Sequence, residues 1–279
     1  MIVDVHTHVF PPEVAAERER YLAADATFRE LYASPKAQLA TAEDLLRSMD
    51  EARVDVSVAL GFAWRDLDAV RRHNDYLLNA AVKSNGRILA FPALPLTTPD
   101  AIEPEMRRCV EAGARGFGEL RPDNLGFDLA GEHGARLGRL ARELGAVLLF
   151  HASEPVGHAY TGKQGGDIGA LYEFTAVNPD ARVIAAHLGG GLPFYVPMPE
   201  VRAALQNVWV DTAAAEYLYD ATVYSQVTQL IGVASLVFGS DFPLLSQKRA
   251  IDHVEQAVPD RATRHAILGD NAAQLLRLE

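Results

Sequence analysis

The chain has 279 residues, of which 49% are hydrophobic and 23% charged, as in an ordinary globular protein with a sizeable core. Its formal net charge of −11 argues against nucleic acid or an anionic membrane as the main partner, since both need a basic surface. No run of about 18 apolar residues predicts a transmembrane helix. The single cysteine, Cys109, cannot form an internal disulfide, which favours a reducing, cytoplasmic location.

The chain begins with an expected β-strand over residues 2–9. Because side chains alternate between the two faces of a strand, we expect Asp4, His6 and His8 to share one face. Two imidazoles two residues apart can bind one divalent cation, and histidine is a common zinc ligand. A surface strand with incidental histidines is the other interpretation. The metal hypothesis therefore depends on finding further ligands in the chain.

Helices and strands alternate along the rest of the chain. A helix expected over 13–32 either covers a site at the end of the first strand or is a solvated excursion. Thr41 and Asp44 then predict a capped helix start. Helices are expected at 42–52, 67–83, 100–112, 131–144, 170–177, 200–206, 221–231 and from 246 and 261 onward. The strands between them are expected at 54–60, 88–94, 115–120, 146–152, 182–188, 208–212 and 235–239.

This alternation predicts an α/β fold of parallel strands joined by helical crossovers. The strands are short and almost continuously apolar, as strands buried on both faces should be. Eight units of about 35 residues are typical of a (β/α)8 TIM barrel, and we expect residues 1–279 to form one such domain. An open doubly wound sheet is the alternative. No Gly-x-Gly-x-x-Gly motif follows the first strand, which disfavours its dinucleotide-binding version.

Side chains capable of chemistry recur where the expected strands end. In a (β/α)8 barrel the active site lies at the carboxyl ends of the strands. The residues at those ends, spaced by whole strand–helix units, are His6, His8, Glu119, His151, His187 and Asp241. Each alone is compatible with a buried, hydrogen-bonded side chain or a helix cap. Together they predict a metal centre.

As a set, the motifs of this chain resemble the amidohydrolase superfamily. The motifs are Asp4-Val5-His6-Thr7-His8, Glu119, His151, His187-Leu188-Gly189-Gly190, Gly239-Ser240-Asp241-Phe242-Pro243 and residues 269–275. The branch that they resemble is the amidohydrolase-related (amidohydrolase 2) group, which includes the aminocarboxymuconate-semialdehyde and resorcylate decarboxylases. The resemblance covers nearly the whole chain. It implies a barrel of the metal-dependent hydrolase type with a divalent metal, most commonly Zn²⁺.

The resemblance also implies roles for the strand-end residues. His6, His8, His151 and Asp241 would hold the main metal ion. His187 would be either a ligand of a second metal ion or an acid or base that faces the substrate. Glu119 lies where some members of the superfamily place a bridging ligand, so the number of ions, one or two, stays open.

The function that we expect is hydrolysis of a small-molecule amide, lactone or ester by a metal-activated water. Asp241 would take the proton of that water and pass it to the leaving group, and His187 would polarise the substrate oxygen. Non-oxidative decarboxylation of a small unsaturated or aromatic carboxylic acid is the alternative, because it uses the same ligands. A binding protein with a structural metal is a third possibility.

Two further residues are predicted to contact the substrate. Arg121 follows Glu119 and either holds a carboxylate through two hydrogen bonds or forms a surface ion pair. His158 lies in a glycine-containing loop after the fifth strand that could move as a lid. We expect a small-molecule substrate, neither nucleic acid nor membrane as a partner, and the homodimer that such barrels often form.

Overall fold

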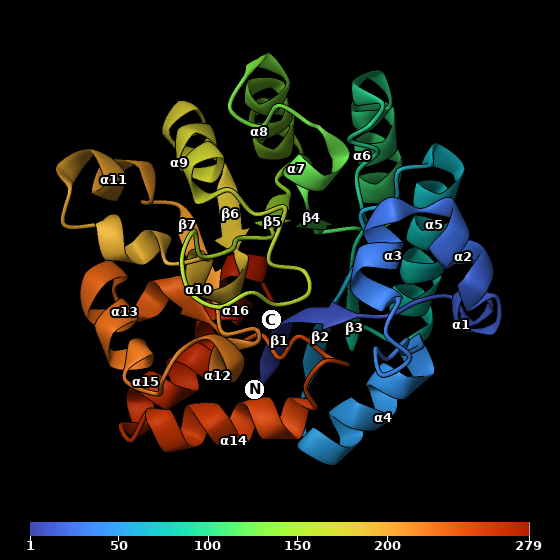
Figure 1. Ribbon diagram of the computed structural model, residues 1–279. Helices are drawn as coiled ribbons and strands as arrows, with labels where there is room; N and C mark the ends of the chain where they lie inside the picture. The colour runs from blue at the N-terminus through green and yellow to red at the C-terminus, as the bar shows by residue number, and fades with distance from the viewer. Residues whose placement is uncertain (279) are drawn as a thin grey trace.

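The computed structural model describes residues 1–278. Within these residues, eight parallel strands alternate with helices that surround them (Figure 1). The strands are β1 (Val3–His8), β2 (Val56–Leu60), β3 (Ile88–Phe91), β4 (Gly116–Leu120), β5 (Val147–Phe150), β6 (Arg182–Ala185), β7 (Val208–Asp211) and β8 (Leu236–Val237). The longer helices are α4 (Ala42–Ala52), α5 (Leu67–Lys83), α6 (Ile102–Glu111), α8 (Glu132–Leu144), α9 (Ile168–Val177), α13 (Val223–Ile231) and α14 (Gln247–Ala257).

The strands form two parallel ladders, β1-β2-β3 and β4-β5-β6-β7-β8, in the order of the chain. Individual backbone hydrogen bonds join the ladders at both ends. Gly118 of β4 donates its N–H to Pro92 O, just after β3, at 3.1 Å. On the other side, Val5 of β1 donates to Phe238 O, just after β8, at 2.9 Å. The eight strands therefore follow one another around a ring, which confirms the expected (β/α)8 fold class.

The first strand departs from simple alternation. The register between β1 and β2 shifts between Asp4 and Thr7. As a result, Asp4 lies against Gln247 of α14, whereas His6 and His8 turn toward each other. The expectation that these three polar side chains share one face is therefore wrong for Asp4, because a local irregularity interrupts the two-residue period.

The segment after β1 is three short helices rather than one. These are α1 (Pro12–Ala16), α2 (Arg18–Ala24) and α3 (Ala26–Tyr32). The break before α3 is at Asp25, which has extended backbone and accepts a hydrogen bond from the N–H of Phe28 as a helix cap. Phe28 stacks on Trp64 with ring centroids 5.2 Å apart, so the segment packs on the residues after β2.

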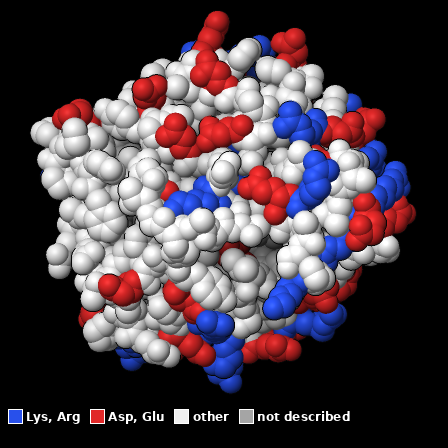
Figure 2. All heavy atoms as spheres, in the orientation of Figure 1, with Lys and Arg blue, Asp and Glu red and all other residues white. Residues whose placement is uncertain are grey.

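This segment covers a cavity of about 630 Å³ at the carboxyl ends of the strands, because Leu31 and Tyr32 are among the residues that line it. Figure 2 shows the surface hollowed near the middle of this face. Of the two interpretations of the segment, a cover for a site is the one that the structure supports.

Several other expectations are confirmed, with small shifts at the ends. Thr41 and Asp44 form a complete capping box at the start of α4, and α5 begins and ends at the expected residues. The sixth strand is shorter than expected because the backbone enters the left-handed region at His187 and Leu188. No helix within residues 1–278 is long and apolar enough to cross a membrane.

Candidate metal centre

The six strand-end residues predicted to form a metal centre come together in the structure. They supply two overlapping groups of potential ligands, and within each group the ligand atoms lie within 4.8 Å of one another. The first group is His6, His8 and Glu119, and the second is Glu119, His151 and His187. Glu119, in β4, belongs to both.

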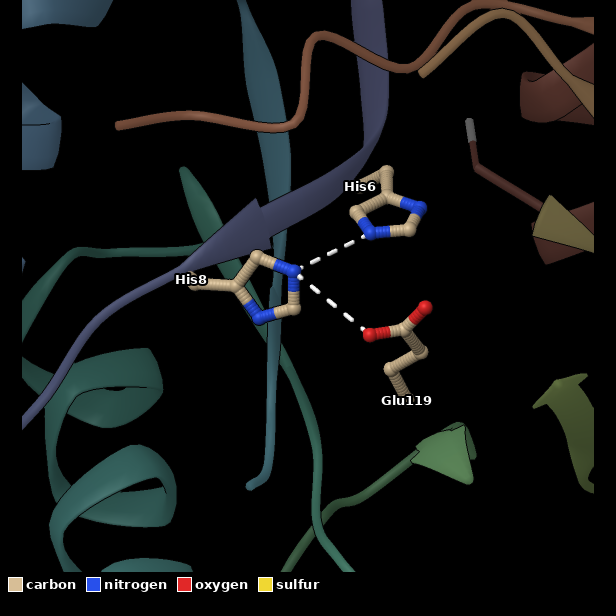
Figure 3. Close-up of side chains that lie close together, drawn as sticks. All are labelled: His6, His8 and Glu119. Atoms are coloured by element: carbon tan, nitrogen blue, oxygen red, sulfur yellow. Dashed lines mark hydrogen bonds and ion pairs between the residues drawn. The ribbon is translucent and has the colours of Figure 1, made fainter. Parts of the chain in front are cut away.

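In the first group, two imidazoles and a carboxylate converge (Figure 3). His6 Nε2 lies 3.1 Å from His8 Nε2, and His8 Nε2 lies 3.8 Å from Glu119 Oε2. Asp241, which follows β8, adds a second carboxylate: its Oδ1 lies 3.3 Å from His8 Nε2 and 3.7 Å from His6 Nε2. These four side chains therefore face one small space.

In the second group, two imidazoles face the other oxygen of the same carboxylate. Glu119 Oε1 lies 2.7 Å from His151 Nδ1 and 3.4 Å from His187 Nε2. The three side chains are almost completely buried, with 8%, 4% and 9% of the side chain exposed for Glu119, His151 and His187. Water therefore screens this group little.

The outer nitrogens of three histidines donate to fixed acceptors. A carbonyl or carboxylate oxygen can only accept, so each of these nitrogens carries a proton. The bonds run from His6 Nδ1 to Asp211 Oδ2 (2.8 Å), from His187 Nδ1 to Ala213 O (3.1 Å) and from His151 Nε2 to Gly162 O (2.9 Å). A neutral ring of this kind would present the lone pair of its inner nitrogen to a bound cation, as metal-ligating histidines do. Without a cation, Glu119 Oε1 competes for the proton of His151 from the Nδ1 side.

The charges of the site favour a cation at its centre. Burial raises the pKa of Glu119, but the adjacent His151 and His187 outweigh it and hold that pKa well below its usual range. Burial also opposes ionisation of Asp241, yet His8 and His6 lower its pKa. His6, in turn, has its pKa raised to about 10, because Asp211 and the other carboxylates outweigh its burial. Lone pairs and carboxylate oxygens that meet in a buried space need a proton or a metal ion between them, so the residues fit a divalent metal.

Asp211 is a supporting residue that sequence reasoning missed. It ends β7, is fully buried, and accepts hydrogen bonds from the ring of His6 and from the backbone N–H of His187 (2.8 Å each). The bond to His187 helps to hold that residue in its left-handed conformation, with φ of 56°. The signal was available, because Asp211 is an acid at the carboxyl end of an expected strand.

Asp4 takes part in a hydrogen-bond network rather than in the cluster of potential ligands. Its carboxylate accepts hydrogen bonds from Ser240 Oγ (2.6 Å) and from Gln247 Nε2 (2.8 Å). Burial raises the pKa of Asp4 to about 6, and these hydrogen bonds oppose the rise. Asp4 therefore supports the residues around Ser240 by hydrogen bonding, beside the potential ligands.

The two predicted substrate contacts lie on the cavity wall. Arg121 is buried, and it donates from Nη2 to Gly162 O (2.8 Å) and Gln164 O (2.5 Å) and from Nε to Asn124 Oδ1 (2.9 Å). Two of its three nitrogens are therefore already engaged. His158 is exposed and lines the cavity. Contact of either residue with a substrate stays a prediction.

The sequence matches a family model described as amidohydrolase over residues 3–278, so the chain belongs to the amidohydrolase family. Among its curated relatives is the gamma-resorcylate decarboxylase of Rhodococcus jostii strain RHA1, 26% identical over 302 residues, which span 88% of this chain and 90% of that protein. The expected branch of the superfamily is thereby confirmed.

Solved structures share the fold. The 2,6-dihydroxybenzoate decarboxylase from Rhizobium superposes with a TM-score of 0.77 at 20% identity, over 99% of this chain and 98% of that chain. The 5-carboxyvanillate decarboxylase from Novosphingobium aromaticivorans, solved with manganese and 4-hydroxy-3-methoxy-5-nitrobenzoic acid, superposes with a TM-score of 0.81 at 17% identity, over 100% and 96%.

These relatives correct the expected reaction. Hydrolysis of an amide, lactone or ester was the main expectation from the sequence, and it is wrong because the curated relatives are decarboxylases. The residues could not separate the two reactions, since both use a divalent ion held by the same imidazole and carboxylate groups. The ion in the Novosphingobium structure is manganese, so zinc gains no support from it.

Proposed function

We propose that this chain is a metal-dependent, non-oxidative decarboxylase of a small unsaturated or aromatic carboxylic acid. The observation that carries the proposal is the convergence of imidazole lone pairs and carboxylate oxygens at the base of a cavity, in a chain similar to gamma-resorcylate decarboxylase. A cavity of about 630 Å³ accommodates a small-molecule substrate.

The divalent ion would be held by His6, His8, His151 and Asp241, with Glu119 as a further ligand because it faces both groups. When bound, it supplies positive charge that fixes an anionic oxygen of the substrate and stabilises negative charge near it. Imidazole and carboxylate donors suit zinc, which remains our prediction from the sequence, and manganese is the alternative.

His187 is the residue that we assign to proton transfer. Burial lowers its pKa, but Glu119 and Asp241 outweigh burial and raise it, which favours the protonated ring. The hydrogen bond from Nδ1 to Ala213 O fixes the ring, so Nε2 is the nitrogen turned toward the cavity side of Glu119. In the reaction, the bond from carbon to the carboxylate breaks, CO₂ leaves, and the carbon keeps the electron pair and takes the proton from His187.

Asp241 is less suited to this step. Its lowered pKa keeps it ionised, so it has no proton to donate at neutral pH. Its place beside the two nitrogens of the first group suits a ligand instead. The roles of the two residues therefore separate: Asp241 holds the ion, and His187 handles the proton.

The walls of the cavity suit a flat, unsaturated substrate. Leu31, Tyr32 and Phe62 line it above the candidate ligands. Apolar and aromatic walls with a few polar groups at the base orient such a molecule with its carboxylate toward the ion. A homodimer and a cytoplasmic location remain predictions from the sequence.

The test is a panel of small aromatic and unsaturated carboxylic acids, offered to the metal-loaded protein in D₂O. We expect CO₂ release and one deuterium at the carbon that carried the carboxylate. A matched His187→Asn protein should bind metal but release CO₂ much more slowly. A product that instead contains an oxygen atom from solvent would contradict decarboxylation.

A further inference from the structure

One backbone carbonyl connects Arg121 to the metal centre. The oxygen of Gly162 accepts from His151 Nε2 at 2.9 Å and from Arg121 Nη2 at 2.8 Å. Gly162 is buried in the loop between β5 and α9, whereas Arg121 directly follows β4. Two segments of the barrel thus meet at a single acceptor that also holds a candidate ligand.

Arg121 is itself held firmly. Its Nε donates to Asn124 Oδ1, and its Nη2 also donates to Gln164 O. Hydrogen bonds from a guanidinium are stronger than neutral ones, and this side chain is only 4% exposed. The guanidinium therefore fixes the backbone at positions 162 and 164 relative to β4.

His151 Nε2 has two polar neighbours at 2.9 Å, Gly162 O and Ser153 Oγ. A hydroxyl can donate or accept, whereas a carbonyl can only accept, so the Gly162 carbonyl is the partner that favours a proton on Nε2. With the proton on Nε2, the lone pair on Nδ1 faces the cluster, 2.7 Å from Glu119 Oε1. Without that carbonyl, the hydroxyl of Ser153 is free to donate to Nε2, and the carboxylate of Glu119 then holds the single proton on Nδ1. The lone pair would then point away from the cluster, and the histidine would be lost as a ligand.

We propose that Arg121 is a positioning residue, which holds the carbonyl of Gly162 so that His151 presents Nδ1 to the metal ion. The inference rests on the proposed metal-dependent function and extends it to a residue that does not touch the ion. It also gives Arg121 a role other than the predicted contact with a substrate carboxylate.

The test measures Co²⁺ binding to metal-free protein, by titration and by the visible spectrum of the bound ion. Arg121→Gln replaces the guanidinium by a shorter, neutral amide, and Gly162→Ala perturbs the same carbonyl from the loop side. Gly162 has a φ of +89°, a conformation that residues with a Cβ rarely adopt, so alanine strains the backbone at this position. Lys163→Gln is the matched control, because Lys163 donates to Val156 O and His158 O of the same loop but not to Gly162.

We expect both variants to bind Co²⁺ about 10- to 100-fold more weakly, with a changed spectrum, while Lys163→Gln matches the wild type. Arg121→Lys, which keeps the charge, should recover part of the affinity. Circular dichroism shows which variants are folded. If Arg121→Gln does not fold, the Co²⁺ affinity of Gly162→Ala tests the inference instead.

Folded variants with the affinity and spectrum of the wild type would overturn the inference. So would a raised KM for the acid substrate with unchanged Co²⁺ affinity, which would make Arg121 a substrate contact. A failure of the proposed function has a different signature, since the wild-type protein itself would then bind no Co²⁺ or release no CO₂.

Discussion

His6 Nδ1 and Asp211 Oδ2 are joined by a hydrogen bond of 2.8 Å between two side chains that have no exposure to solvent. The first belongs to β1 and the second to β7, so the bond connects two strands that lie on either side of β8. Because Asp211 also accepts from the backbone of His187, one carboxylate orients residues of both ligand groups.

We therefore expect Asp211→Asn to weaken metal binding about 10- to 100-fold. The amide has the size of the carboxylate but no charge. It can also turn its –NH2 group toward the ring of His6, whereas the carboxylate only accepts hydrogen bonds, so the ring is oriented less well. Competition with a chelator of known affinity measures the change. Asp220→Asn is the control, since Asp220 is exposed and bonds only Thr222. Equal affinity in the two variants would contradict the role of Asp211.

Glu119→Gln should reduce the metal content per chain, because Glu119 is shared by both groups of potential ligands. Elemental analysis of gently purified protein measures the number of metal ions per chain. Two ions falling to one would identify Glu119 as a bridge between them. One ion in both proteins would place Glu119 outside the ligands. Glu173→Gln on the exposed side of α9 serves as the control.

His187→Gln should lower kcat by a factor on the order of 10² to 10⁴, the range that a positioned proton donor contributes. KM should change little, and the protein should retain the metal ion, because the proposed ligands His6, His8, His151 and Asp241 are unchanged. Steady-state kinetics and metal analysis on the same preparation check both statements. If metal and activity disappear together, His187 is a ligand rather than the proton donor.

His73 should make the folded state sensitive to acid. Its Nδ1 accepts from Trp64 Nε1 (3.0 Å), and its Nε2 donates to Val9 O (2.8 Å), so the buried ring is neutral. Burial lowers its pKa from 6.5 to about 4. Between pH 6.5 and 4, the His73 ring is protonated in the unfolded chain but stays neutral in the folded protein. The free energy of unfolding is therefore highest above pH 6.5 and falls as the pH decreases toward 4.

The loss amounts to about 3 kcal/mol of unfolding free energy. Urea unfolding of the wild type and of His73→Gln between these two pH values measures it. The variant should lose less stability over that range than the wild type does. Exposed His265→Gln is the control, and its pH dependence should match the wild type. A His73→Gln curve parallel to the wild-type curve would refute the assignment.

The barrel and most of the site followed from two regularities in the sequence. Apolar strands recur at intervals of one strand–helix unit, and polar residues at the ends of several strands point to a common centre, as Glu119 and His151 do. The break of the 13–32 helix at Asp25 was not predicted, because the capping bond to Phe28 outweighs the helical propensity of the neighbouring residues.

Other features lie beyond single-residue reasoning. The carbonyl of Gly162 acts through its backbone, and every residue has such a carbonyl, so no residue type marks its role. The direction of Asp4 depends on a register shift that the pattern of Val3, Asp4 and Val5 does not reveal. The choice between hydrolysis and decarboxylation depends on the substrate, which the ligands alone do not specify.

The roof of the cavity comes from a different part of the chain than its floor. Leu31 and Tyr32 belong to the segment that follows β1, and the candidate ligands belong to the strand ends. Insertions or exchanges in that segment can therefore change the shape of the cavity without moving a candidate ligand. Substrate choice and metal chemistry are separable traits in this barrel, so a library confined to residues 26–38 is the natural starting point for changing its selectivity.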